Sequence, residues 1–384
     1  MTPARLDLGA ARLDRGGHLL VKRALADVSP GQRLAVTGSD PELVTHLRAW
    51  ARAWAADFEP ADNSLGAPRR DRWSGAERAG TASHPDANPP ATWGLAARGA
   101  AVEAGTPRFD FRVGQEAWSD DAGRLYAAAA AAQWDPATAV DWQAAFELPE
   151  EVEDAVVQLM PFLVENETAA LLVPARFVSQ IHPHFREVMQ LLAINAADEA
   201  RHVEVFTRRA LLRRPEMALS TAGGQASLKT LLDEPNFALA SFMLSVLGEG
   251  SFLSLLRFID HFGPDPVTRQ VCRLAAQDEA RHVAFGLAHL EEHARRDPSL
   301  LDRLARAVEH RHGALVHTAG LNEEVFDALV LLAAGRWDNL EAGWEAVVAL
   351  RLEMDNGRQA RLRRLGFTEP DAARLSSLHT RNFM

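Results

Sequence analysis

A five-residue string that occurs twice constrains this chain more than any other feature. Asp198-Glu199-Ala200-Arg201-His202 returns eighty residues later as Asp278-Glu279-Ala280-Arg281-His282. Both copies lie in segments with helical periodicity, and residues three apart share one face of a helix. Each copy therefore directs one carboxylate and one imidazole toward the same point. A single Glu-x-x-His carries little weight, but two identical copies on helical backgrounds indicate a shared site.

The segments around the two copies predict a set of long helices. Turns containing proline or glycine, at 182–184 and 263–266, separate long apolar segments with helical periodicity. We expect long helices at 149–181, 185–214, 237–262 and 267–296, and further helices at 119–133, 298–318, 322–335 and 338–365. Pro161 and Pro174 are expected to bend the first long helix. Residues 215–234 are expected to be a loose connection, with 221–224 as its loosest part.

Two further glutamates stand out in the first and third long helices. Glu249 is the only acidic residue in the apolar stretch 242–256. Burying an unpaired carboxylate costs free energy, and a bound metal ion removes that cost. In the first long helix, Glu165 and Glu167 are both candidates for the equivalent position. Aligning the Arg-Phe dipeptides of the two helices puts position 168 opposite Glu249, so Glu167 is favoured over Glu165.

This constellation resembles the non-haem di-iron carboxylate proteins of the ferritin-like superfamily, over about residues 149–296. The string Asp-Glu-x-Arg-His is most similar to the hydroxylase subunits of multicomponent monooxygenases. Ribonucleotide reductase small subunits and p-aminobenzoate N-oxygenases are more distant relatives. The resemblance implies a mainly α fold, a ferritin-like four-helix bundle with extra C-terminal helices. It also implies that each metal has three ligands, one set being Glu167, Glu199 and His202 and the other Glu249, Glu279 and His282.

The resemblance assigns further roles around these ligands. Glu199 and Glu279 are the candidates to bridge the metals. Asp198, Arg201, Asp278 and Arg281 would surround the site, with each aspartate accepting a hydrogen bond from the metal-bound histidine of the opposite copy. The general reason is that a ligating imidazole needs its other N–H held, which determines tautomer and ring orientation.

Four carboxylates and two imidazoles suit iron or manganese better than copper or structural zinc. We expect two iron ions, with a mixed Mn/Fe pair as the alternative. The resemblance implies an enzyme, an O₂-activating di-iron oxidase or oxygenase that acts on a small organic substrate. Its electron donor would be external, a reductase or a ferredoxin. The alternative is a ferritin-type protein that oxidises or stores iron, but the extra C-terminal helices and the N-terminal domain favour the enzyme.

Three positions depart from the relatives. The only tyrosine, Tyr126, lies outside the four predicted core helices, which argues against a reductase-type tyrosyl radical. The N-oxygenases have a third histidine where this chain has Ala275. The multicomponent hydroxylases have a threonine where this chain has Leu253. Because Ala275 replaces that third histidine, a site with six ligands is the expectation.

The N-terminal region carries a second resemblance. Residues 13–17, 20–25, 29–34 and 39–41 are similar to the TusA/SirA-like sulfur-carrier fold, a small α/β sandwich. Residues 33–37 alternate like a strand, and so do residues 108–113. The family's Cys-Pro motif has no counterpart here, so we expect a docking or regulatory domain rather than sulfur transfer.

The predicted organisation has three regions. Residues 1–115 form the TusA/SirA-like domain, with a flexible insertion at about 60–92 that is rich in Pro, Gly, Ser, Asn and Arg. Residues 116–320 form the di-iron helical bundle, and residues 321–384 form additional C-terminal helices that pack on it.

Composition bounds the location and partners of the chain. Its net charge is −11 over 384 residues and no basic patch is present, so no nucleic-acid partner is expected. No secretory signal and no apolar run of roughly 18 residues is evident, which predicts no membrane association. Cys272 is the only cysteine, so no intrachain disulfide can form. These features favour a cytoplasmic protein and allow a homodimer.

Overall fold

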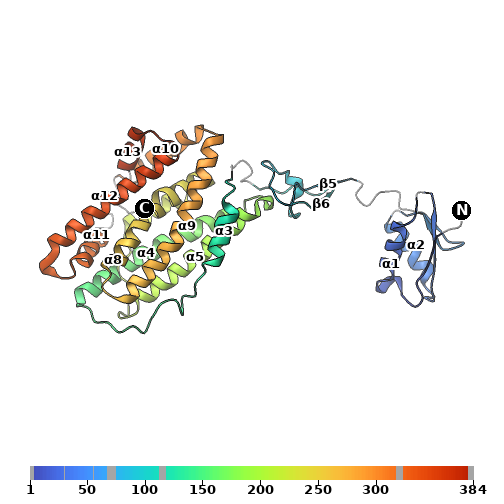
Figure 1. Ribbon diagram of the computed structural model, residues 1–384, viewed down its shortest axis with the longest axis horizontal. Coiled ribbons are helices and arrows are strands. Elements are labelled where there is room, and N and C mark those ends of the chain that lie inside the picture. The colour runs from blue at the N-terminus through green and yellow to red at the C-terminus, as the bar shows by residue number, and fades with distance from the viewer. Residues whose placement is uncertain are drawn as a thin grey trace. The chain divides into compact units, whose positions relative to one another are not determined.

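A computed structural model describes residues 4–29, 31–54, 56–66, 75–111, 118–316 and 323–378 (Figure 1). The chain divides into two compact units. The first comprises Met1–Ala79 and Gly99–Thr106, and the second comprises Gly80–Arg98 and Pro107–Met384. Each unit has its own hydrophobic core.

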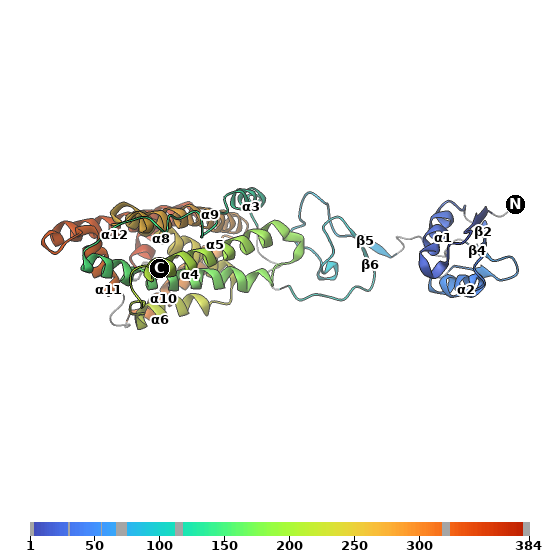
Figure 2. The ribbon, with the colours of Figure 1, turned by 90° about the horizontal axis from the view of Figure 1, so that it is seen from below.

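The first unit is a small α/β sandwich, as predicted. Its sheet has the order β1-β2-β4-β3, with β1 parallel to β2 and β4 antiparallel to both β2 and β3. The strands are β1 (Ala4–Asp7), β2 (Arg33–Thr37), β3 (Phe58–Glu59) and β4 (Ser64–Gly66). Helices α1 (Gly17–Ala26) and α2 (Leu43–Ala53) share one hydrophobic core with this sheet (Figure 2). The strand expected at 33–37 is confirmed.

The remaining strands belong to a second, two-stranded sheet. β5 (Ala76–Arg78) pairs antiparallel with β6 (Ala101–Glu103). Strands β4 and β5 lie within 60–92, the stretch whose composition predicts a flexible insertion. The strand expected at 108–113 is wrong for residues 108–111, which pair with no strand among the described residues. The rings of Phe109 and Phe111 stack on each other there, 5.7 Å apart, so the alternating aromatics serve ring packing. Residues 112 and 113 lie outside the described residues.

The second unit is a helical bundle, which confirms the predicted mainly α fold. Helix α4 packs against α5, and α8 packs against α9 (Figure 1). A continuous helical segment runs through α7, the π-helix η4 and α8. The bounds are α3 (Ala122–Ala131), α4 (Glu150–Val178), α5 (Arg186–Ala210), α7 (Phe237–Ser241), η4 (Phe242–Glu249), α8 (Gly250–Phe262) and α9 (Pro266–Arg296).

The C-terminal helices follow this core. They are α10 (Ser299–Leu315), α11 (Glu323–Ala334), α12 (Leu340–Arg364) and α13 (Glu369–Ser377), of which α13 was not predicted. The connection expected to be loose contains a helix, α6 (Ala222–Leu232). Its Thr221 cap accepts a hydrogen bond from the Gly224 N–H, and buried Leu228 and Leu231 anchor it in the core. Capping and burial together offset the flexibility of its two glycines.

A buried network of ion pairs and hydrogen bonds joins three segments of the bundle near the C-terminal end of α5. The Arg209 guanidinium of α5 donates to both carboxylate oxygens of Glu153 on α4, at 2.8 and 2.9 Å. It also donates to Asp265 at 2.8 Å and to the Thr268 hydroxyl at 2.7 Å. Three segments of the bundle are thus joined through one side chain that is fully buried.

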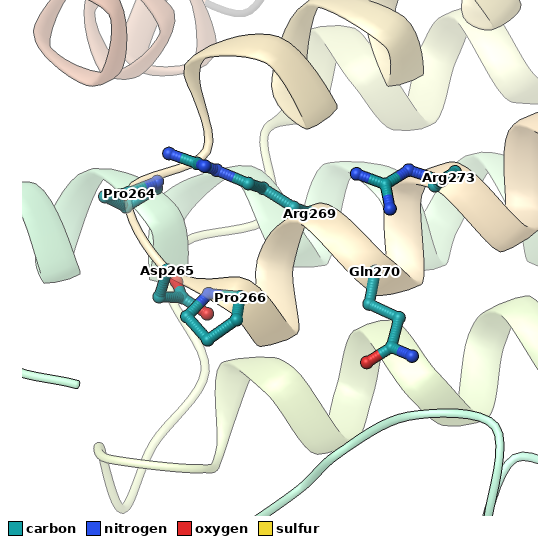
Figure 3. Close-up of a pocket in the computed structure, with 6 residues that line it drawn as sticks. All are labelled: Pro264, Asp265, Pro266, Arg269, Gln270 and Arg273. Carbon is teal, nitrogen blue, oxygen red and sulfur yellow. The ribbon is translucent and has the colours of Figure 1, made fainter. Parts of the chain in front are cut away.

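A surface hollow of about 360 Å³ lies beside this network, at the start of α9 (Figure 3). It is lined by Pro264, Asp265, Pro266, Arg269, Gln270 and Arg273. None of the predicted metal ligands lines it, so it is separate from the site described below.

Two helical segments of the bundle are long and apolar enough to cross a membrane, contrary to the expectation from the sequence. They are Glu150–Val178 and Phe237–Phe262, with 67% and 89% of their apolar windows buried inside the structure. Helices in the core of a bundle meet the same criterion. Both segments carry predicted metal ligands.

Candidate metal centre

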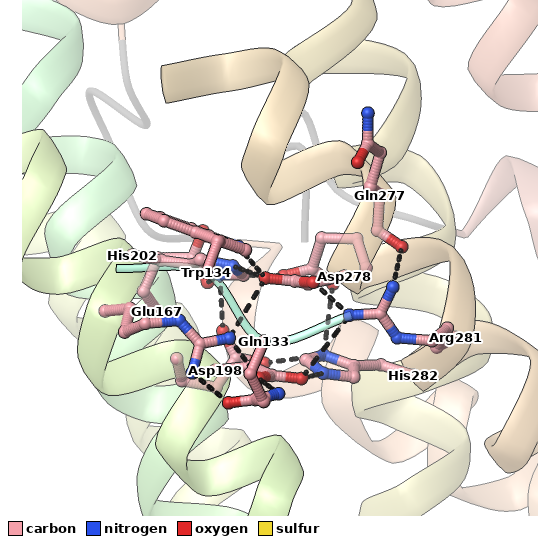
Figure 4. A network of polar contacts seen from close by, with 12 residues as sticks. Gln133, Trp134, Glu167, Asp198, His202, Gln277, Asp278, Arg281 and His282 are labelled. Carbon is pink, nitrogen blue, oxygen red and sulfur yellow. Dashed lines mark hydrogen bonds and ion pairs between the residues drawn. The ribbon is translucent and has the colours of Figure 1, made fainter. Parts of the chain in front are cut away.

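The structure brings the six predicted ligands together inside the bundle. Figure 4 labels three of them, Glu167, His202 and His282. They fall into two groups of four, and in each group one ligand atom per residue lies within 4.8 Å of the others. One group is Glu167, Glu199, His202 and Glu279, and the other is Glu199, Glu249, Glu279 and His282. Glu199 and Glu279 belong to both groups, which is the placement that a bridging carboxylate requires.

Burial and position favour Glu167 over Glu165 in the first long helix. Glu167 is 1% exposed and lies in the cluster. Glu165 is only partly buried and contributes to neither group of the described residues. The two side chains are two positions apart on α4 and therefore point to different faces of the helix.

Both histidines direct the same nitrogen into the cluster. His202 Nδ1 lies 3.1 Å from Glu199 Oε2 and 3.3 Å from Glu167 Oε2. His282 Nδ1 lies 2.9 Å from Glu199 Oε1 and 4.0 Å from Glu249 Oε1. In each ring the other nitrogen, Nε2, points away from the carboxylate cluster.

An aspartate from the opposite repeat holds each Nε2. His202 Nε2 lies 3.1 Å from Asp278 Oδ2, and His282 Nε2 lies 3.2 Å from Asp198 Oδ2. When Nε2 carries the proton and donates it to the aspartate, Nδ1 is left with a free lone pair directed into the cluster. The crossed pairing thereby prepares both imidazoles as ligands.

The two arginines of the repeats hold these aspartates in place. Arg201 bonds most closely to Asp198 on its own helix and lies 3.4 Å from Asp278. Arg281 bonds most closely to Asp278 on its own helix and lies 3.9 Å from Asp198. Each arginine therefore neutralises both aspartates, with the closer contact inside its own helix.

Two residues that sequence reasoning missed complete this outer layer. Gln133 donates from Nε2 to Asp198 at 2.8 Å and accepts from Arg201 at 2.5 Å. The Trp134 indole donates to Asp278 Oδ2 at 2.8 Å (Figure 4). Both follow α3, outside any repeat, and no periodicity connects them with the motifs. The only signal in the sequence is an amide and an indole at the end of an alanine-rich helix.

Several carboxylate oxygens in the cluster lack hydrogen-bond partners among the described residues. They are Glu167 Oε1, Glu249 Oε2 and both oxygens of Glu279. Buried oxygens without partners are costly, and cations satisfy them. Together with the two Nδ1 atoms, these oxygens form an oxygen-rich donor set with two nitrogens, which fits two iron or manganese ions.

The electrostatics of the cluster favour bound protons whenever cations are absent. Burial, with repulsion from Glu199, raises the pKa of Glu167 well above its usual range. Burial, with repulsion from Glu279, raises the pKa of Glu249 in the same way. Burial acts against ionisation of Glu199 too, but attraction to His282 outweighs it and lowers the pKa of Glu199.

The pKa values of the two histidines are raised, although burial by itself would lower them. Burial alone would lower the pKa of His202, but attraction to Glu167 and the bond to Asp278 raise that pKa well above its usual range. Glu199 and Asp198 raise the pKa of His282 in the same way. Two divalent cations would displace these protons from the ligand atoms.

One of the four glutamates of the cluster, Glu249, lies on a π-helix. Glu249 is the last residue of η4, and π-helical turns are frequent at functional sites. On α9, a methyl group at Gly286 would lie 2.3 Å from the Ser245 Cβ of η4. The glycine therefore lets the two helices approach closely, one turn beyond His282.

A small cavity adjoins the cluster. Its volume is about 20 Å³, and Glu199 and Glu249 form part of its lining. Asn195, one turn before Glu199, directs into this region a buried carbonyl oxygen with no partner among the described residues. Phe237 and Phe285 supply the aromatic lining.

No protein-family model matches this chain, and no curated protein matches it. Its structure is similar to solved structures described as R2-like ligand-binding oxidases. One, with an aerobically reconstituted Mn/Fe cofactor, is 19% identical with a TM-score of 0.51 and covers 64% of this chain and 93% of its own. A variant with an aerobically reconstituted Fe/Fe cofactor is 19% identical with a TM-score of 0.51. The match covers 64% of this chain and 94% of that variant's chain.

Another variant, with an anaerobically reconstituted Mn/Fe cofactor, is 18% identical with a TM-score of 0.50, covering 68% of this chain and 98% of its own. At such identities the likeness establishes the fold. The helical unit of this chain thus has the ferritin-like fold of the R2-like ligand-binding oxidases, and its buried Glu–His cluster is able to hold two metal ions.

Proposed function

We propose that this protein is an oxidase or oxygenase that reduces O₂ at two metal ions held by the six cluster residues. The observation that carries the proposal is the pair of four-residue groups that share Glu199 and Glu279. Two iron ions, or one manganese and one iron as in the similar solved structures, would supply the redox chemistry. Glu167 and His202 would hold one ion, and Glu249 and His282 the other.

The protein's own contribution is to hold ligands and protons. The two aspartates keep the imidazoles in the tautomer that leaves Nδ1 free. Glu249 lines the adjoining cavity, so the ion that it would hold would lie next to the place where a small molecule can bind. Reducing O₂ to water takes four electrons. If one oxygen atom enters a substrate, that substrate supplies two electrons and an external donor supplies the other two.

The adjoining cavity is sized for a very small molecule in this conformation. A volume of about 20 Å³ accommodates one molecule the size of water or O₂. A larger organic substrate can reach the cluster only if aromatic side chains such as Phe237 move aside. The enclosing apolar wall excludes bulk water, which protects an oxidation from side reactions.

The proposal is tested by anaerobic loading with Fe(II) followed by exposure to O₂. Without an electron donor, the oxidase should oxidise about two irons per chain and then stop, and Glu199→Ala should consume almost no O₂. Glu165→Ala, on the same helix as Glu167 but outside the cluster, is the matched control and should behave as the wild type. Continued oxidation of tens of irons per chain would instead support the ferritin-type alternative. No O₂ consumption by metal-loaded wild type would overturn both.

A further inference from the structure

A third hollow, larger than the two described above, lies in the helical unit and contains none of the metal-cluster residues. Its volume is about 480 Å³, and its walls come from residues 83–87, Arg98 and the first turns of α3 and α5. Trp118 and Phe185 line it with aromatic rings. A cavity of about 150 Å³ is enough to bind benzene, so this hollow has ample room for a monocyclic molecule.

A single layer of aromatic rings separates this hollow from the cavity beside the cluster. Trp118 lines the large hollow, and Phe237 lines the small cavity. The two ring centroids are 5.3 Å apart. His289 stacks on Trp118 at 4.7 Å and contacts Phe237 at 5.2 Å. Trp118 and Phe237 therefore form the partition between the two spaces, and His289 packs against both rings.

In the described part of the chain, no hydrogen bond holds the Trp118 ring in the partition. Its Nε1 is buried and lacks a partner among the described residues. Its position depends on contacts with Phe185, Phe237 and His289. A rotation of the indole would break no hydrogen bond among the described residues, so ring packing alone holds the partition closed.

The charges around the large hollow balance. The Arg98 side chain is 2% exposed and donates to both oxygens of Glu187, at 2.6 and 3.1 Å. Asp120 and Arg296 add one charge of each sign. The hollow therefore favours neither cations nor anions. It offers aromatic surface for a ring and polar groups for one substituent.

We propose that this hollow is an antechamber that binds a neutral monocyclic aromatic molecule with a polar substituent, and that Trp118 and Phe237 gate its passage to the metal cluster. The passage of the molecule to the metal cluster rests on the proposed function. Binding in the antechamber does not, because no metal ligand lines it.

The antechamber is tested with phenol as the probe and metal-free, full-length protein. Gly123 lines the hollow, and a methyl group there meets only Glu187 Cγ at 3.5 Å, so Gly123→Leu fills the space without a backbone clash. We expect this variant to weaken phenol binding at least about tenfold in calorimetric titrations. Gly313→Leu, where nothing lies within 4 Å, is the matched control and should bind as the wild type. Equal affinity in both variants, or no binding by the wild type, would overturn the proposal.

The gate is tested by NMR on the same metal-free protein with labelled methyl groups. Val188 reports the antechamber and Leu244 reports the cluster cavity. In the wild type, phenol should show Overhauser contacts with Val188 that are much stronger than those with Leu244. Trp118→Ala should raise the Leu244 contacts several-fold, and the exposed Trp337→Ala should not.

Phe237→Ala provides the second route to the same result if Trp118→Ala does not fold. Contacts with Leu244 that stay at the wild-type level in a folded gate variant would refute the gate. A failure of metal loading would contradict the proposed function and leave both tests on metal-free protein intact.

Discussion

At the scale of single residues, each copy of the repeated string works for both halves of the site. Its glutamate and histidine face the cluster, while its aspartate reaches across to the histidine of the other copy. Asp278 illustrates the balance. Burial disfavours its charge, but the bond and attraction to His202 outweigh burial and lower the pKa of Asp278 to about 2. The carboxylate therefore stays ionised and accepts the hydrogen bond from the imidazole N–H.

Removing that charge should weaken metal binding. Asp278→Asn can present its amide to His202 and so favour the wrong tautomer. We expect a loss of about 10- to 100-fold in Mn(II) or Fe(II) affinity, measured by competition with a chelator. Asp260→Asn, which breaks an exposed pair with Arg273, is the control and should have no effect. An unchanged affinity in Asp278→Asn would mean that His202 does not depend on this partner.

The raised pKa values of the cluster predict how the stability of metal-free protein depends on pH. A carboxyl whose pKa is higher in the folded state than in the unfolded state stabilises folding at low pH, and this stabilisation is lost as pH rises through the folded pKa. Glu167, Glu249 and both histidines all act in this direction. Metal-free protein should therefore have a lower Tm at about pH 8 than at about pH 6.

Glu249→Gln removes one of these titrations and should flatten the curve. Its Tm at about pH 8 should exceed that of the wild type, because a neutral amide replaces a carboxyl that ionisation would leave buried and unpaired. Thermal unfolding in the presence of a chelator measures both curves. Parallel curves for the two proteins would show that Glu249 does not titrate in this range.

At the scale of helices, the Arg209 network shows how the bundle is secured at the end opposite the antechamber. Four hydrogen bonds from one guanidinium connect α4, α5 and the start of α9. Burial opposes the charge, but bonds to Glu153 and attraction to Asp265 outweigh it and raise the pKa of Arg209.

Breaking the Arg209 network should lower the free energy of unfolding by several kcal/mol, about 3–5 kcal/mol for the loss of one partner of a buried pair. Arg209→Met leaves two carboxylates without their cation, and we expect a loss of about 3–5 kcal/mol in the free energy of unfolding. Arg214→Met, which removes a surface pair with Asp154, should cost less than about 1 kcal/mol. Chemical denaturation of both variants provides the comparison. Similar losses in the two would show that burial does not distinguish these pairs.

The long helices were predictable and their irregularities were not. Apolar periodicity located α4, α5 and α9 to within a few residues, because each buries a continuous face. The π-turns of η4 lie against α9 at Gly286, and the sequence has no periodic signature for the π-turns or for that contact. The repeat identified the ligand types. The roles of Gln133 and Trp134 depend on where the chain after α3 crosses the bundle, which is a tertiary property.

At the scale of the whole molecule, the chain divides into two compact units, and the cluster residues all belong to one of them. The metal cluster lies entirely in the helical unit, and so does the segment Gly80–Arg98. The predicted domain boundaries at 115 and 320 remain predictions. The TusA/SirA-like identity of the first unit remains a resemblance.

Truncation should separate the contributions of these parts. A chain that begins at residue 80 should bind two metals, because it keeps every cluster residue and Arg98. A chain that begins at residue 116 loses the pair of Arg98 with Glu187 and should have a lower Tm, with the same metal count if it folds. Elemental analysis and thermal unfolding of both chains test this. Loss of metal from a well-folded 80–384 chain would place part of the site in the first unit.

Metal stoichiometry of Glu249→Ala tests the central claim most directly. Glu249 is buried in an apolar helix, and its Oε2 has no partner among the described residues. Anaerobic loading with Fe(II) followed by elemental analysis should give about two metals per chain in the wild type and in the Glu165→Ala control, and clearly fewer in Glu249→Ala. Two metals per chain in Glu249→Ala, or well under one in the wild type, would contradict a dinuclear site at this cluster.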